Sequence, residues 1–91
     1  IINADVVLTD KVISMNDKVN KKKKIKDFKN YRINSKLMSK AKKSILLHCL
    51  PRGKEVSDDV FLGNKSKVWQ QAQNRIYVQK SILLYCLDKL R

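Results

Sequence analysis

The chain has few of the residues that hold small disulfide-rich or metal-binding domains together. Its 91 residues include two cysteines, one histidine, one proline and two glycines. Cys49 and Cys86 lie far apart and form no C-x-x-C pair, so the sequence predicts neither a disulfide framework nor a zinc site. Free thiols are typical of a reducing compartment, and we expect a cytoplasmic location without a metal or cofactor.

Long apolar runs are also missing. No run approaches the roughly 20 residues that a membrane-spanning helix needs. The first residues, IINADVVLTD, lack the basic leader and the cleavage site of a signal peptide. We therefore expect no membrane partner. Because the chain has no initiator methionine and opens directly in strand-like sequence, we expect it to be a piece of something longer.

Acidic residues are the other scarce class. Eight Asp and Glu stand against 21 Lys and Arg, which gives a formal net charge of +13. Such a charge favours polyanions, so a basic nucleic-acid-binding module is one alternative. Lysines 21–24, however, surround a predicted helix instead of converging on one face, and the sequence has no helix-turn-helix, zinc finger or RNA-binding aromatic pair. We interpret them as a solvated helix surface and expect no nucleic-acid partner.

Apolar runs alternate with helix-forming segments along the chain. The runs ADVVLT and SILLHCL are typical of strands buried on both faces of a parallel sheet, and Pro51 ends the second. We predict an α/β fold that is part of a doubly wound, Rossmann-like parallel sheet with about three strands and three or four helices. The expected strands are 4–9, 31–34 and 44–50. The expected helices are 17–29, one capped by Asn34 or Ser35, a turn after Ser57, and a long amphipathic helix from about 66 to the end with a stripe of Ala72, Ile76, Leu83, Leu87 and Leu90.

Polar residues follow two of the predicted strands. Asp10 comes after the first, and His48-Cys49 ends the other. Because ligands of open α/β sheets bind outside the carboxyl ends of the strands, these residues are candidates for a site. The alternative is that Asp10 caps the next turn and that His48 is a hydrogen-bonded core residue. A proline directly after a strand can aim carbonyl oxygens into a cleft, although a plain turn is the commoner outcome.

Three segments, in order, resemble motifs of the ornithine carbamoyltransferase family. DKVISM at 10–15 is similar to its D-x-W-x-S-M-G loop, HCLPR at 48–52 to its H-C-L-P-R turn, and AQNR at 72–75 to its A-x-N-R helix start. The spacing between them fits as well. The resemblance implies that residues 1–91 are the carboxy-terminal part of the ornithine-binding domain, including the final helix. The carbamoyl-phosphate domain, with its S-T-R-T loop, is absent from these residues.

The resemblance implies transfer of the carbamoyl group of carbamoyl phosphate to the δ-amine of L-ornithine, which gives L-citrulline and phosphate in arginine biosynthesis. It implies a homotrimer or a multiple of trimers, no cofactor, and a cytoplasmic enzyme, or a mitochondrial matrix enzyme in a eukaryote. The 91 residues alone are expected to be inactive, because most ligands of carbamoyl phosphate are missing. A carbamoyltransferase for another amine and a non-catalytic remnant stay open as alternatives.

The resemblance also implies roles for single residues. Asp10 and Ser14 would hold the α-amino group of ornithine, and Met15 would hold its carboxylate end through the backbone. Cys49 and Asp10 are the catalytic candidates. Cys49 would lie beside the attacking δ-amine. The implied ligands of carbamoyl phosphate are Cys49, Arg75 and the carbonyl of Leu50, beside a cis Leu50–Pro51 bond. The implied structural residues are His48 and Pro51.

Two positions depart from the family pattern. Val12 stands where the family has Trp, and Asn16 stands where it has Gly. Asn adopts the left-handed backbone conformation more readily than most residues, so a turn at Asn16 is compatible with the family loop.

Overall fold

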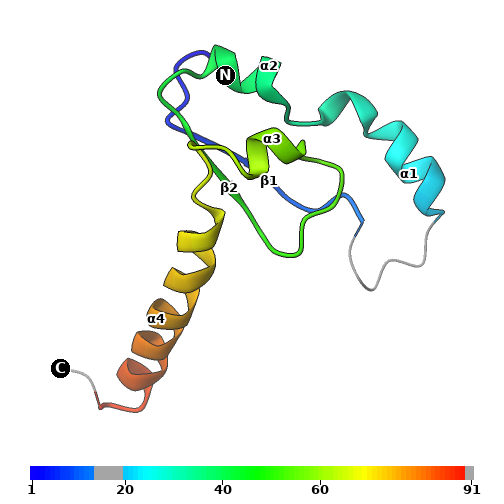
Figure 1. Cartoon of the computed structure of the whole chain (residues 1–91). Coiled ribbons are helices and arrows are strands. Elements are labelled where there is room, and N and C mark those ends of the chain that lie inside the picture. Colours follow the sequence, from blue (N-terminus) through cyan, green and yellow to red (C-terminus); the bar gives the residue numbers. More distant parts are fainter. Residues whose placement is uncertain (14–19, 90–91) are drawn as a thin grey trace.

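The computed structural model describes residues 1–13 and 20–89, and its elements alternate between strands and helices (Figure 1). The two strands are parallel, which confirms the predicted α/β class. In chain order, the elements are β1 (Val6–Thr9), α1 (Lys21–Asp27), the 3-10 helix η1 (Lys29–Tyr31), α2 (Ser35–Lys40), β2 (Ile45–His48), α3 (Asp58–Phe61) and α4 (Val68–Cys86).

The sheet of the described residues has two strands instead of the predicted three. β1 and β2 pair in parallel, with Val6 opposite Ile45 and Thr9 opposite His48. The strand expected at 31–34 is wrong: Ile33 makes only a single bridge, to Val56. The segment cannot extend, because η1 occupies its beginning and the side chain of Asn34 already caps α2 by accepting from Leu37 N at 2.9 Å.

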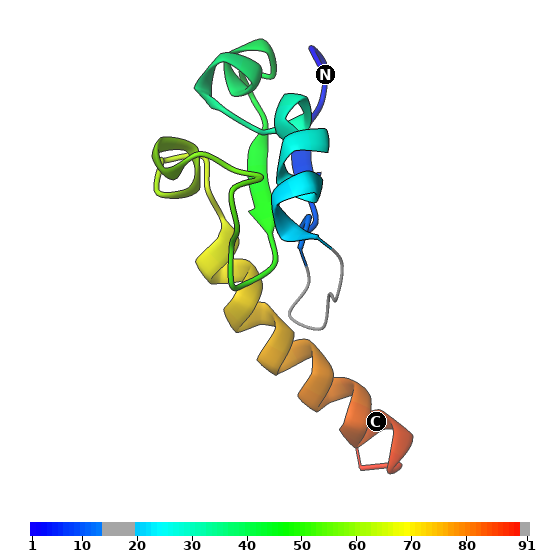
Figure 2. The same cartoon turned by 90° about the vertical axis from the view of Figure 1, so that its right-hand side faces the viewer.

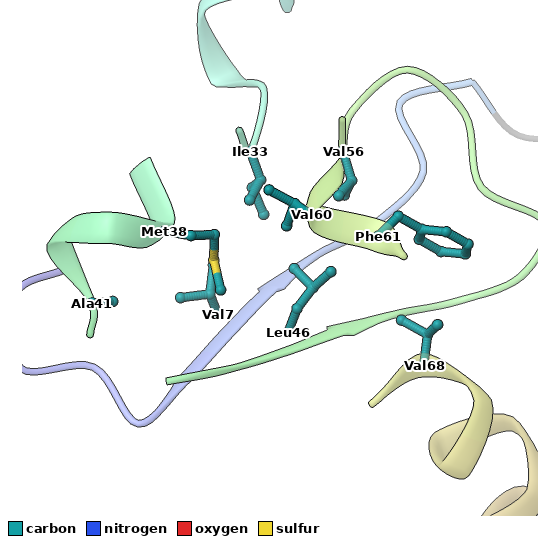
Figure 3. Close-up of a cluster of buried hydrophobic side chains, with 9 residues drawn as sticks. All are labelled: Val7, Ile33, Met38, Ala41, Leu46, Val56, Val60, Phe61 and Val68. Carbon is teal, nitrogen blue, oxygen red and sulfur yellow. The ribbon is translucent and has the colours of Figure 1, made fainter. Parts of the chain in front are cut away.

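One face of the sheet carries the core. Val7 and Leu46 lie opposite each other on the two strands, and Leu46 is completely buried. Side chains from α2, α3 and the first turn of α4 converge on this face (Figure 3). The buried apolar cluster comprises Val7, Ile33, Met38, Ala41, Leu46, Val56, Val60, Phe61 and Val68.

The opposite face of the sheet is uncovered by the described residues. Val6 and Leu8 point away from the core and are 47% and 63% exposed. The expectation that this strand is buried on both faces is therefore wrong for the described chain. Successive residues of a strand point to opposite faces, and the described helices that contribute to the core cover one face only.

The local signals at the helix starts are largely confirmed. Asn34 caps α2, and a single helical turn follows Ser57, as predicted. The predicted helix 17–29 is observed from Lys21 to Asp27, and its first expected residues lie outside the described range.

Helix α4 projects from the body of the molecule (Figures 1 and 2). Val68 is its buried residue, whereas Ile76 and Leu83 of the predicted stripe are 65% and 63% exposed. Tyr77 and Ile82, outside that stripe, are exposed as well. The Cα radius of gyration is 16.2 Å, compared with about 12 Å for a compact chain of this length. Among the described helices, none has the length and apolar character to cross a membrane.

The core predicts a clear contrast between two leucines. Leu46→Ala removes a completely buried side chain, and we expect the free energy of unfolding to fall by about 2–5 kcal/mol. Leu62→Ala, at a residue that is 69% exposed, is the matched control and should change it by less than about 0.5 kcal/mol. Urea denaturation followed by circular dichroism measures both. Equal effects of the two substitutions would contradict the assignment of the core.

Candidate active site at the carboxyl ends of the strands

The parallel register brings Asp10 and Cys49 together. Thr9 lies opposite His48, so the residues that follow them leave the same edge of the sheet as neighbours. The thiol Sγ of Cys49 donates to Oδ1 of Asp10 at 3.3 Å, and both residues are exposed. This edge is where an open parallel sheet presents its ligands.

The two side chains have different protonation states at neutral pH. The backbone N–H of Lys11 donates to Oδ1 of Asp10 at 2.7 Å, and this bond, followed by the one from Cys49, lowers the pKa of the carboxyl group. The pKa of the Cys49 thiol is raised, first by partial removal of water and then by the hydrogen bond to Asp10 and its negative charge. The edge therefore presents a carboxylate beside a neutral thiol.

The imidazole of His48 points away from this edge into the core. The residue is 1% exposed, and its Nδ1 contacts the carbonyl oxygen of Cys49. Its Nε2 lies 2.7 Å from Oε1 of Glu55, which is 5% exposed. This second contact is short, but it is not aligned as a hydrogen bond. The pair ties the end of β2 to the far end of the turn that follows it.

Glu55 also shapes the backbone of this turn. Its Oε1 accepts from the N–H of Gly53 at 2.7 Å. A Cβ atom at position 53 would meet Oε2 of Glu55 at 2.6 Å, so a larger residue would have to displace the carboxylate. Leu50 and Pro51, within this turn, are exposed, and the bond between them is cis.

Arg52 holds the other side of the turn. Its NH1 donates to the carbonyl oxygen of Val56 at 2.8 Å and forms an ion pair with Asp58 at 2.6 Å. Its guanidinium lies 4.5 Å from the centre of the Phe61 ring, a cation–π distance. These contacts occupy Arg52, so we interpret it as a structural residue of the turn.

Arg75 is not brought into contact with Asp10 and Cys49. It is exposed on α4, and its side chain forms no hydrogen bond or ion pair within residues 1–13 and 20–89. One helical turn earlier, Oε1 of Gln71 accepts from the backbone N–H of His48 at 2.9 Å. Ser14 and Met15, the other predicted ornithine ligands, lie outside the described residues, as does Asn16.

Sequence reasoning missed Glu55 and Gln71. No spacing rule connects Glu55 to His48, because their contact depends on the shape of the turn between them. Gln71 directly precedes the AQNR segment, so its position beside a predicted site was visible although its partner was not.

Neither a metal centre nor an enclosed cavity lies at Asp10 and Cys49 in the described chain. The described residues contain no group of three or more His, Cys, Asp or Glu side chains that could hold a metal ion, and both cysteines are free. A cavity of about 370 Å³ lies between the residues after β1, helix α1 and the turn at Gly53, but neither Asp10 nor Cys49 lines it. The candidate site of the described chain is therefore the open edge of the sheet at Asp10 and Cys49.

Comparisons with known proteins show which family the chain is similar to. Residues 1–86 match the family model described as aspartate/ornithine carbamoyltransferase, Asp/Orn binding domain. An ornithine carbamoyltransferase of Methanococcus maripaludis is 50% identical over an alignment of 90 positions, which covers 94% of this chain and 30% of that protein. One of Nitratiruptor is 48% identical over an alignment of 92 positions, which covers 98% of this chain and 29% of that protein.

Solved structures show the same fold. Anabolic ornithine carbamoyltransferase from Campylobacter jejuni matches with a TM-score of 0.82 and 42% identity over 96% of this chain and 30% of that one. The enzyme from Pyrococcus furiosus matches with a TM-score of 0.78 and 40% identity over 90% of this chain and 27% of that one. The chain thus spans 30% or less of the length of these relatives. It belongs to the aspartate/ornithine carbamoyltransferase family.

Proposed function

We propose that the chain is the carboxy-terminal part of the ornithine-binding domain of an ornithine carbamoyltransferase. The complete enzyme transfers the carbamoyl group of carbamoyl phosphate to the δ-amine of L-ornithine and releases L-citrulline and phosphate. The observation that carries this proposal is the contact of Cys49 with Asp10 at the exposed edge of a parallel sheet. The relatives described above are all named ornithine carbamoyltransferases, which supports ornithine over another amine and favours neither a nucleic-acid-binding module nor a remnant.

Asp10 supplies the charge that an amino-acid substrate requires. Its lowered pKa keeps it ionised at neutral pH, and its exposure leaves it open to a cationic partner. A carboxylate binds the α-ammonium group of ornithine through a charge-assisted hydrogen bond. In the proposal, Ser14 and the backbone of Met15 complete the ornithine site.

Cys49 orients the attacking amine and does not act as a nucleophile. Its raised pKa keeps the thiol neutral, whereas a nucleophilic cysteine needs its thiolate. Transfer from carbamoyl phosphate requires a neutral amine, a fixed carbonyl group and donors for the developing negative charge, without a covalent enzyme intermediate. The carbonyl of Leu50 accepts from the carbamoyl NH₂, and the planar guanidinium of Arg75 binds the phosphate.

The remaining parts of the proposal concern the complete enzyme. It carries a carbamoyl-phosphate domain outside these 91 residues, assembles as a trimer or a multiple of trimers, and works in the cytoplasm or, in a eukaryote, in the mitochondrial matrix. The test is citrulline formation from carbamoyl phosphate and ornithine by the complete enzyme, with the isolated chain as the inactive comparison. Citrulline formation by the chain alone, or none by the complete enzyme, would contradict the proposal.

Asp10→Asn tests the ornithine contact. The substitution keeps the shape and removes the charge, so we expect KM for ornithine to rise at least about tenfold because a charge-assisted bond is lost. The KM for carbamoyl phosphate should stay within about twofold, since that ligand binds other groups. Asp27→Asn, at an exposed residue of α1, is the control and should leave both constants unchanged. Steady-state kinetics with each substrate varied separates these outcomes.

The raised pKa of Cys49 can be tested by thiol alkylation, without an activity assay. Because the pKa is raised, the thiol persists as pH rises, and its alkylation by iodoacetamide should accelerate only at clearly alkaline pH. Asp10→Asn removes the negative charge and should shift this acceleration to lower pH. Cys86, which is exposed and free, serves as the internal reference in a mass-spectrometric time course. An unchanged profile in the variant would show that Asp10 does not hold the thiol proton.

A further inference from the structure

Helix α4 is held to β2 and α3 by few contacts. Val68 is its buried residue, and the ring of Trp69 meets that of Phe61 at 5.6 Å between centres. The next contact along the helix is the hydrogen bond from the backbone N–H of His48 to Gln71. Beyond Gln71, no hydrogen bond among the described residues joins α4 to the sheet. The bond to Gln71 is thus the last hydrogen bond between the sheet and α4 in the described chain before the helix projects from the body of the molecule (Figure 1).

The bond to Gln71 continues the hydrogen bonding of the outer edge of β2. Alternate residues of a strand direct their N–H groups to the same edge. The N–H of Leu46 donates to the carbonyl oxygen of Lys65 at 2.8 Å on the edge away from β1. His48, two residues on, donates from that edge to Oε1 of Gln71 at 2.9 Å. The side-chain amide of Gln71 therefore takes the place that the backbone carbonyl of another strand would occupy.

This position connects two parts of the proposed carbamoyl phosphate site. His48 is the residue directly before Cys49 and Leu50. Gln71 lies four residues before Arg75, and residues four apart on a helix occupy the same face, about 5–6 Å between Cβ atoms. A single hydrogen bond thus relates the strand end that carries Cys49 to the helical turn that carries Arg75.

We propose that Gln71 is a positioning residue, which sets the separation between Arg75 and the Cys49–Leu50 turn and so aligns carbamoyl phosphate between them. This inference rests on the proposed function. The phosphate end and the carbamoyl end of one small molecule are held by groups on two different elements. A displacement of about 1 Å between those elements lowers the rate without removing any ligand-binding residue.

The test compares variants of the complete enzyme. Gln71→Leu removes the acceptor at similar side-chain size, and Gln70→Leu places the same change on the exposed neighbouring residue as a matched control. We expect Gln71→Leu to lower kcat/KM for carbamoyl phosphate about tenfold and to leave KM for ornithine within about twofold. Gln70→Leu should match the wild type in both.

A second measurement follows the hydrogen bond itself. Hydrogen exchange resolved at the backbone amide of His48 should accelerate in Gln71→Leu and stay protected in Gln71→Glu, because a carboxylate oxygen still accepts. Unchanged exchange in Gln71→Leu would overturn the anchoring. Accelerated exchange with unchanged kinetics, or with an equal rise in KM for both substrates, would overturn the positioning role. A wild-type enzyme that makes no citrulline would overturn the proposed function and this role together, and is recognised by the wild-type assay alone.

Discussion

The parallel register of β1 and β2 is the constraint on which the rest of this structure depends. With Thr9 opposite His48, the next residue of each strand leaves the sheet at the same edge, and Asp10 meets Cys49 there. The same register turns Val7 and Leu46 toward one face, where the helices bury them. A slip of one residue would exchange the two faces and separate the carboxylate from the thiol.

The turn after β2 keeps this edge in shape through buried polar contacts. His48 and Glu55 are almost completely buried, and the carboxylate of Glu55 also receives the N–H of Gly53. Two buried polar groups in contact add little net stability, because both lose their water on burial, but removing one partner leaves the other without a contact. The pair therefore acts mainly by specifying the path of the turn that presents Cys49, Leu50 and Pro51.

Two apolar surfaces of the described chain have no partner within it. One is the sheet face with Val6 and Leu8, and the other is α4, whose Ile76 and Leu83 are exposed. Isolated surface leucines are ordinary, but grouped apolar side chains of this extent usually mark contacts with other protein surface. The proposed function accounts for them, since the chain spans 30% or less of the length of its relatives.

Much of the local structure was determined by the sequence itself. The apolar runs, the cap at Asn34 and the turn after Ser57 depend on neighbouring residues, so the α/β alternation could be predicted, and so could Asp10 and Cys49 as residues at strand ends. Tertiary structure alone decided that Glu55 pairs with His48 and that Gln71 completes the strand edge. It also decided that residues 31–34 form no strand. These outcomes depend on which segments approach one another when the helices pack, and local propensity carries no information about partners 7 or 23 residues away.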